Sequence, residues 1–230
     1  MKVNPMKVEL LTVTENPVQT CEQAAATCYD SQPSEDGRII RGCARSGHLS
    51  VWEHMNFTFR IAGISRACLA QMTRHRLMSF SVRSQRYCKE NDFAVVIPPS
   101  VAHKDLARQT YNNLIDNIRN VYAFLLDAGV PPEDARFILP NACETELTVT
   151  MNARELMHFC HERLCTRAQW EIRELAGLMA DAAGEKVPAV RPYLVPKCET
   201  YPDYPFCPER QGCGKHKKLS EVYHDDEQPV

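Results

Sequence analysis

The sequence predicts an α/β fold of the α+β type, with a central, mostly antiparallel sheet flanked by long helices. Short segments in which apolar and polar residues alternate, as in half-buried strands, recur along the chain. Between them lie longer segments whose apolar residues follow helical spacing. Hydrophobic residues make up 44% of the 230 residues, which is enough for a core. This length suits one larger domain, or one domain with extensions.

Four segments are predicted as strands. Residues 8–14 alternate in part, and residues 56–61 alternate cleanly between apolar and polar side chains. Residues 94–97 form a short apolar run that two prolines close, and residues 146–151 form the last strand.

Helices are expected over the intervening segments. Residues 20–29 are rich in alanine, and a second helix begins at Ser65 and runs toward Arg74. A long helix is predicted over residues 103–128, with Gly129 in the place of a C-cap. Its predicted apolar face is formed by Leu114, Ile118, Val121 and Leu125.

The last long helix is predicted to begin after Asn152 and to run to about Ala183, and a break within it is left open. Asn152 followed by Glu155 has the pattern of an N-cap with its capping-box partner. From Pro188 onward the composition changes to prolines, tyrosines and cysteines. We therefore expect a main domain over residues 1–195 and a Cys- and Pro-rich tail over residues 196–230.

The charge and cysteine content limit the class of protein. The net charge is −2 and the isoelectric point about 6.4, so no global basic field indicates a nucleic-acid partner. No long apolar run follows the N-terminus, so we expect neither a signal peptide nor a membrane span. Eleven cysteines, an odd number, favour reduced thiols and a cytoplasmic location over a disulfide framework.

The tail offers one candidate metal site. Three cysteines and a histidine are a sound ligand set for structural zinc. The alternative, which we favour, is unligated thiols in a proline-rich tail, so that no metal is expected. The candidate ligands are Cys198, Cys207, Cys213 and His216.

Residues 74–87 form the densest cluster of phosphate-binding groups in the chain. Four arginines, one histidine and three serines fall within these fourteen residues. Each guanidinium keeps its charge and offers five fixed N–H donors. Such a cluster repels itself unless an anion binds to it, so the predicted ligand is polyanionic, with phosphates as the first candidate.

Two further segments carry groups that suit a site. Arg154 and His158 are four residues apart on the last helix and share one face. Arg163 needs a polar or anionic partner, which either a ligand or a nearby carboxylate could provide. Upstream, residues 47–54 hold two histidines, a glutamate and a serine, which suit either a metal site or a structural turn.

Arg74-His75-Arg76, seven further residues and then Ser84-Gln85-Arg86-Tyr87 closely resemble the signature of the flavin-dependent thymidylate synthases. Other segments resemble that family's motifs in the same order, and the likeness covers roughly residues 8–195. These segments are His48-x-Ser50-x-x-Glu53-His54, Ala135-Arg136-x3-Pro140, Asn152-x-Arg154 through Arg163, and Ala168-Gln169-Trp170-Glu171-Ile172.

The resemblance implies a homotetrameric α/β enzyme whose sites are built from several subunits, with residues 1–195 as its catalytic domain. Such an enzyme converts dUMP to dTMP, taking the methylene group from methylenetetrahydrofolate and the hydride from FAD that NADPH has reduced. It implies no nucleic-acid or membrane partner. All of its implied ligands are anions, which agrees with a local arginine cluster in a nearly neutral chain.

The resemblance also implies which residues form the site. Arg163 would be catalytic, because a guanidinium beside the uracil ring favours ionisation at N3. The dUMP site would comprise Gln71, Met72, Thr73, Arg74, Val82, Arg83, Ser84, Gln85, Arg86, Arg136 and Arg163. The FAD site would comprise Ser50, Arg74, His75, Arg76, Val82, Asn152, Arg154 and His158.

The chain departs from the family pattern at two places. Ser81-Val82 stands where many members have Asn-Glu, so only backbone contacts with a ligand are expected at Val82. His158 stands where many members have Asn, which affects the detail of FAD contact.

Two other functions compete with this interpretation. One is a nucleic-acid-binding module that uses the arginine cluster together with a zinc-binding tail. The other is a metal-dependent hydrolase that uses His48, Glu53 and His54.

Overall fold

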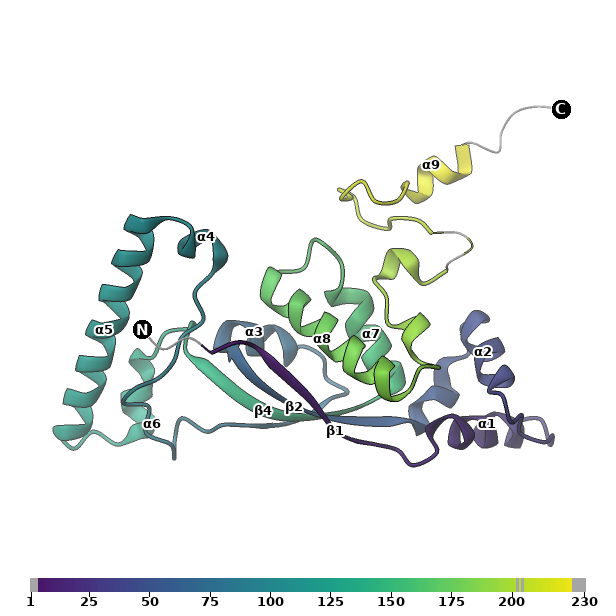
Figure 1. Cartoon of the computed structure of the whole chain (residues 1–230), viewed down its shortest axis with the longest axis horizontal. Coiled ribbons are helices and arrows are strands. Elements are labelled where there is room, and N and C mark those ends of the chain that lie inside the picture. Colours follow the sequence, from purple (N-terminus) through teal and green to yellow (C-terminus); the bar gives the residue numbers. More distant parts are fainter. Residues whose placement is uncertain (1–3, 202, 204, 225–230) are drawn as a thin grey trace. The chain divides into compact units, whose positions relative to one another are not determined.

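A four-stranded antiparallel sheet forms the centre of the fold, in the strand order β1-β2-β4-β3. Figure 1 shows this sheet in the computed structural model, which describes residues 4–201, 203 and 205–224. Its strands are β1 (Lys7–Val13), β2 (Asn56–Ser65), β3 (Ser79–Val82) and β4 (Glu144–Asn152). The mixture of sheet and helices confirms the predicted α+β class.

The chain divides into two compact units. Unit 1 comprises Met1–Lys7, Arg60–Arg74 and Phe80–Val149. Unit 2 comprises Val8–Phe59, His75–Ser79 and Thr150–Val230. Strands β2 and β4 contribute residues to both units, and the cysteine-rich tail belongs to unit 2.

The two long strands follow the alternation that the sequence predicts. In β2, Phe57, Phe59 and Ile61 are fully buried, while their neighbours are more exposed. In β4, every second residue from Thr145 to Met151 is buried. One side of these strands therefore packs in the core.

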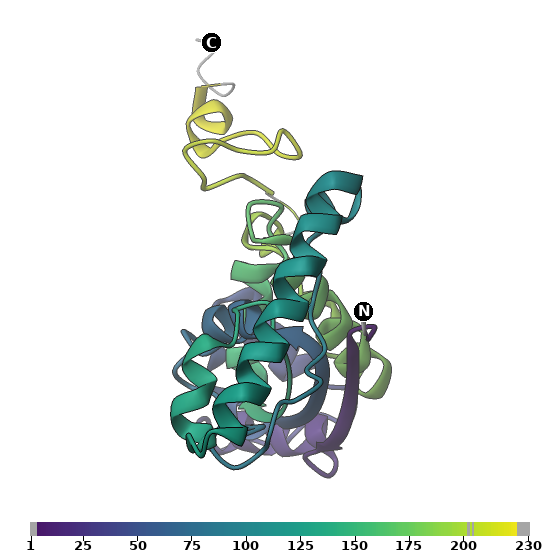
Figure 2. The same ribbon diagram turned by 90° about the vertical axis from the view of Figure 1, so that its left-hand side faces the viewer.

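Unit 1 contains the long helix α5. Its buried face is formed by Ile115 and Tyr122, and Ile115 packs with Phe93, Val95 and Cys143. Figure 2 shows α5 along its length. The helical elements of the unit are α3 (Arg66–Met72), α4 (Pro99–Ala102), α5 (Asp105–Asp127), α6 (Pro132–Ala135) and the 3₁₀ turn η2 (Arg136–Ile138).

Unit 2 holds the remaining helices of the described residues. Its core includes Trp52, which is fully buried with its ring centroid 5.2 Å from that of Tyr193. Its elements are α1 (Pro17–Thr27), α2 (Arg38–Arg45), η1 (Leu49–His54), α7 (Ala153–Arg163), α8 (Trp170–Lys186), η3 (Arg191–Tyr193), η4 (Lys197–Glu199) and α9 (Leu219–His224).

Several predicted helix ends are confirmed. The Ser65 side chain accepts a hydrogen bond from the backbone N–H of Cys68 at the start of α3. Asn152 accepts from the backbone N–H of Glu155 and caps α7. Helix α5 ends just before Gly129, whose φ of 85° is a left-handed conformation that favours glycine. The break left open in the last helix lies between α7 and α8.

Two expectations are wrong. Residues 94–97 do not form a strand, because only Val95 bridges to Cys143 before Pro98 and Pro99 lead into α4. On α5, Leu114 and Val121 are 57% and 41% exposed. Ile118 of the predicted face does pack against the core, so the buried face overlaps the predicted one but is turned toward Ile115 and Tyr122.

No helix in the described part of the chain combines the length and the apolar character that crossing a bilayer requires.

Candidate functional site

In unit 1, two arginines from distant parts of the sequence converge on one glutamate. Arg86 Nη2 lies 3.1 Å from Glu133 Oε2. Arg136, at the start of η2, donates from Nε to the Glu133 backbone oxygen at 3.0 Å. Both side chains of the Arg86–Glu133 pair are about half exposed. The fold thus brings two guanidiniums to Glu133 at the surface of the unit, Arg86 at its carboxylate and Arg136 at its backbone oxygen.

Arg83 is held more firmly than Arg86. Its Nε lies 3.1 Å from Oε1 of the buried Glu90. This hydrogen bond and the charge of Glu90 raise the pKa of the Arg83 guanidinium. The Arg83 backbone N–H donates to Glu146 at 3.0 Å, and Arg66 donates to the Arg83 carbonyl at 2.7 Å. The loop after β3 is therefore fixed at its first residue.

The remaining predicted dUMP residues of unit 1 lie on the end of α3, on β3 and in the loop after β3. Met72 is fully buried, so only its backbone can meet a ligand, whereas Thr73 and Arg74 are exposed. Ser84 Oγ accepts a 3.2 Å hydrogen bond from the Arg86 backbone N–H, which shapes the turn between them. The partly buried Gln71, Val82 and Gln85 complete the set.

In unit 2, His75 connects two residues of α7. Arg163 Nε donates to His75 Nε2 at 3.0 Å, and His75 Nδ1 lies 3.4 Å from Glu155 Oε1. Burial, followed by the charges of Arg163 and His158, lowers the pKa of His75 to about 4. The imidazole is therefore neutral near pH 7, with its proton on Nδ1 facing the carboxylate.

The other predicted FAD residues of unit 2 lie on η1, on α7 and beside His75. Arg154 Nη1 donates to Glu53 Oε1 at 2.6 Å, and both side chains are about half exposed. His158 is exposed, with its ring centroid 5.5 Å from that of His75. Ser50 and Arg76 are exposed as well. These side chains offer hydrogen-bond donors to an anionic ligand.

Sequence reasoning missed the carboxylates that hold these arginines. Glu155 was assigned only to the capping box, although it also faces His75. Glu53 was assigned to a possible metal site or turn, but it pairs with Arg154. Glu133 and Glu90 were not singled out, because nothing in the local sequence relates them to the arginines that they contact.

The metal-dependent hydrolase has no support in the geometry. Within the described ranges, the group of three metal-ligand side chains that lie together is Cys198, Glu199 and His216. His48, Glu53 and His54 do not form such a group, and Glu53 is engaged by Arg154.

Comparison with known proteins identifies the family to which the chain belongs. The family model "Thymidylate synthase complementing protein" matches residues 9–189, which covers most of the chain. A flavin-dependent thymidylate synthase of Geobacter sulfurreducens is 40% identical over 96% of this chain and 99% of its own length. One from Pyrococcus furiosus is 37% identical over 94% of this chain and 98% of its own. The chain belongs to the flavin-dependent thymidylate synthase family.

Solved structures agree with this assignment. The flavin-dependent thymidylate synthase ThyX of Helicobacter pylori, complexed with FAD and dUMP, is 26% identical with a TM-score of 0.68. That match covers 82% of this chain and 99% of the other. The UMP/dUMP methylase PolB of Streptomyces cacaoi, at 23% identity, shares the fold with a TM-score of 0.72 over 88% of this chain and 97% of its own.

Proposed function

We propose that Arg86 and Arg136 bind the phosphate of dUMP in the reaction that this chain catalyses, the conversion of dUMP to dTMP. The observation that carries the proposal is their convergence on Glu133. A half-exposed ion pair contributes little, about 0–1 kcal/mol. A phosphate dianion that accepts several charge-assisted hydrogen bonds is a stronger partner and can replace the carboxylate. At Arg86 the Glu133 carboxylate thus occupies the place proposed for the phosphate, while Arg136 lies beside it on the backbone oxygen of the same residue.

The exposed donors of unit 2 suit FAD. Its diphosphate needs hydrogen-bond donors, and Arg154 and His158 on α7 and Arg76 next to His75 are exposed. Asn152 directs its side-chain oxygen to the start of the same helix. Bound FAD supplies the hydride, with NADPH as the reductant and methylenetetrahydrofolate as the one-carbon donor. The residues of this chain contribute binding and orientation.

Arg163 is the residue that we assign to catalysis. A cation beside the uracil ring stabilises the negative charge that develops when N3 ionises. The neutral His75 orients this guanidinium by accepting from its Nε, and Glu155 holds the imidazole in the required tautomer. No cysteine or serine nucleophile is needed in this scheme.

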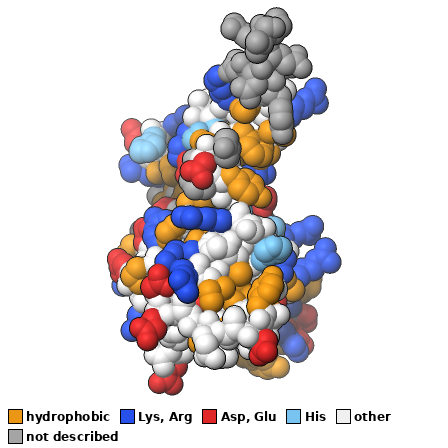
Figure 3. Space-filling view, turned by 90° about the vertical axis from the view of Figure 1, so that its right-hand side faces the viewer, with side chains coloured by type: hydrophobic (Ala, Val, Ile, Leu, Met, Phe, Trp, Pro, Cys, Tyr) orange, Lys and Arg blue, Asp and Glu red, His pale blue; other side chains and the backbone are white. Residues whose placement is uncertain are grey.

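The setting of the enzyme belongs to the same proposal. We expect a cytoplasmic homotetramer that shares its active sites, with a catalytic domain over residues 1–195 and a separate tail over residues 196–230. Nucleic acid is not a partner, since the net charge is −2. The face shown in Figure 3 carries basic, acidic and apolar side chains interspersed, without one continuous basic surface.

Visible absorbance of the purified protein tests the function. We expect a flavin spectrum that bleaches on addition of NADPH and dUMP, followed by dTMP formation once methylenetetrahydrofolate is added. Arg86→Ala should raise the KM for dUMP about 10- to 100-fold, because charge-assisted hydrogen bonds to phosphate contribute roughly 1.5–3 kcal/mol.

The matched control is Arg108→Ala, which removes an exposed arginine of α5 that pairs with Asp105. It should leave the KM for dUMP unchanged. A protein that takes up no FAD would contradict the flavoenzyme assignment, and equal KM values for the two variants would contradict the phosphate role of Arg86.

A further inference from the structure

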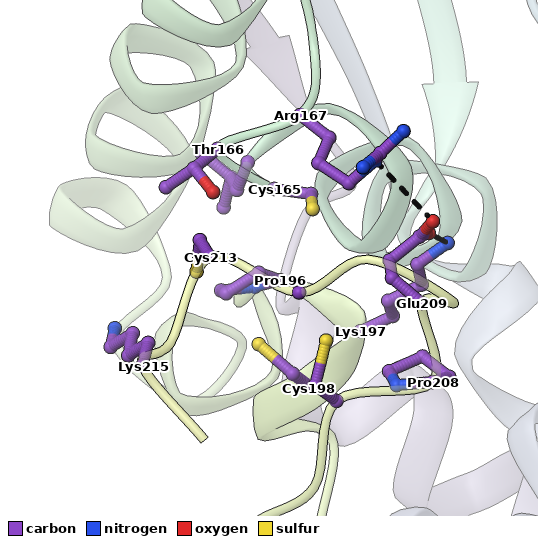
Figure 4. A pocket seen from close by; sticks show the side chains of 13 residues that line it. Cys165, Thr166, Arg167, Pro196, Lys197, Cys198, Pro208, Glu209, Cys213 and Lys215 are labelled. Atoms are coloured by element: carbon purple, nitrogen blue, oxygen red, sulfur yellow. Dashed lines mark ion pairs between the residues drawn. The ribbon is translucent and has the colours of Figure 1, made fainter. Parts of the chain in front are cut away.

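Four cysteines of unit 2 line one small cavity. Its volume is about 50 Å³, and Cys165, Cys198, Cys207 and Cys213 are among the residues that surround it. Figure 4 shows Cys165, Cys198 and Cys213 on different sides of this space. Cys165 follows α7, and the other three belong to the tail, with Cys198 in η4. Segments distant in the sequence thus bring thiols to one place.

Individual contacts place these cysteines around the cavity. Burial and the charge of Glu199, followed by the nearby Cys165 and Cys207, raise the pKa of the Cys198 thiol. Cys213 accepts hydrogen bonds from the Thr166 hydroxyl and from the Lys215 backbone N–H. A Cβ added at Gly212 would meet Cys207 Sγ at 3.0 Å, so the backbone passes close to that sulfur.

We propose that these four cysteines bind one structural zinc ion. Zinc takes four thiolates in a tetrahedral arrangement at roughly 2.3 Å. All four cysteines are free thiols, and binding would release their protons while the ion takes their place. No three of these four sulfurs lie within 4.8 Å of one another in the structure, so the ion would have to draw them inward.

The charges around the cavity suit such a cluster. One zinc ion with four thiolates carries a net charge of −2 by formal count. Three cations, Arg167, Lys197 and Lys215, line the same cavity. Lys197 lies 2.5 Å from Glu209 and Arg167 lies 3.5 Å from it, as the dashed lines of Figure 4 mark. Their positive charge would offset that of the thiolate cluster.

This ligand set differs from the sequence-based candidate by exchanging His216 for Cys165. His216 Nε2 lies 3.2 Å from Glu199 Oε1, and Lys215 pairs with the same carboxylate. Cys198, Glu199 and His216 lie close enough to form an alternative site. We favour the four thiolates because the carboxylate already pairs with Lys215, and because a closed set of four thiolates is an established structural zinc site.

The site would fasten the tail to the loop that follows α7. Cys165 comes two residues after Arg163, the residue assigned to catalysis. Arg167 in the same loop donates to the Gln211 carbonyl at 2.8 Å. An ion that joins Cys165 to Cys207 and Cys213 would hold this loop, and with it the end of α7.

Metal analysis of the purified full-length protein tests the proposal. We expect one zinc per chain, reduced at least tenfold in Cys165→Ser and retained in His216→Ala. The matched control is Cys28→Ser, which changes an exposed cysteine of unit 2 outside the cavity. Full zinc in Cys165→Ser, or its loss in His216→Ala, would overturn the four-cysteine site.

Alkylation of the native protein gives a second measurement that does not depend on the folding of a variant. The four cysteines should resist iodoacetamide until a chelator removes zinc, while Cys28 reacts in both states. A disulfide among the four, or reaction that is indifferent to the chelator, would overturn the proposal. Neither measurement uses flavin or dUMP, so failure here leaves the thymidylate synthase function untouched.

Discussion

Arg163 donates a 3.0 Å hydrogen bond from Nε to Nε2 of His75, the middle residue of the Arg-His-Arg motif. The other nitrogen of this imidazole lies 3.4 Å from Glu155 Oε1. His75 is 6% exposed, and its ring packs against Phe159 with centroids 5.0 Å apart. The histidine in the motif therefore connects Arg163 to the first turn of α7.

Replacing the histidine should impair the enzyme through Arg163. We expect His75→Leu to lower kcat about 10- to 100-fold, because a hydrogen bond to a charged group contributes roughly 1.5–3 kcal/mol. His75→Gln, which keeps an acceptor, should recover part of the loss. Steady-state kinetics with saturating dUMP would measure both effects. A fall in flavin content without a fall in kcat per bound flavin would instead assign His75 to FAD binding.

The same histidine should make stability depend on pH. Its pKa is lowered from 6.5 to about 4 in the folded protein, so the unfolded chain binds more protons between these values. The contribution of the neutral His75 to the free energy of unfolding is therefore fully present above pH 6.5, and it is lost as the pH falls toward 4. The loss is on the order of 3 kcal/mol at most.

Urea unfolding at pH 5 and pH 8 would measure this dependence. His75→Leu should reduce the difference in free energy of unfolding between the two pH values. The control His103→Ala, at the end of α4, should leave that difference unchanged. An unaltered pH dependence in His75→Leu would show that other groups, such as the partly buried His161 with its lowered pKa, cause the acid sensitivity.

Local patterns were sufficient to predict the strands that alternate and the helix ends that are capped. The alternation in β2 and the N-cap at Asn152 involve residues that are close in the sequence, so both can be recognised from a short segment. The face of α5 was misassigned because both Leu114 and Ile115 fit a helical spacing. Only contact with Phe93 and Cys143 decides which of them is buried.

The candidate site, too, could be predicted from the sequence only in part. The arginines were found from their density and from the family resemblance, but their carboxylate partners were not. Glu133 meets Arg86, and Glu53 meets Arg154, across long stretches of sequence. Cys165 was missed for the same reason, since no spacing rule relates it to the tail cysteines that share its cavity. Long-range pairing depends on the fold, and a single sequence does not encode it in any short pattern.

Glu133 should compete with dUMP for Arg86. We expect Glu133→Gln to tighten dUMP binding roughly two- to fivefold, because it removes a half-exposed ion pair that contributes up to about 1 kcal/mol. Isothermal titration with dUMP would measure the change, with Asp105→Asn, which breaks the exposed pair with Arg108, as the control. Weaker binding in Glu133→Gln would show that the carboxylate positions Arg86 instead of occupying the place of the phosphate.

Arg154 and Glu53 should differ in their effect on flavin, although they form one ion pair. We expect Arg154→Ala to weaken FAD binding at least about tenfold, since it removes a charge-assisted donor to the diphosphate. Glu53→Gln leaves that donor in place and should change FAD affinity less than about twofold, because a half-exposed pair contributes little to the position of the guanidinium.

Quenching of flavin fluorescence on titration of the apoprotein would measure both affinities, with Arg38→Ala on α2 as a control for loss of one exposed arginine. Equal losses in Arg154→Ala and Glu53→Gln would mean that the pair acts as a unit. The 2.6 Å contact would then serve to hold η1 against α7, and the hydrogen-bond donors for the diphosphate would have to come from Arg76 and His158 instead.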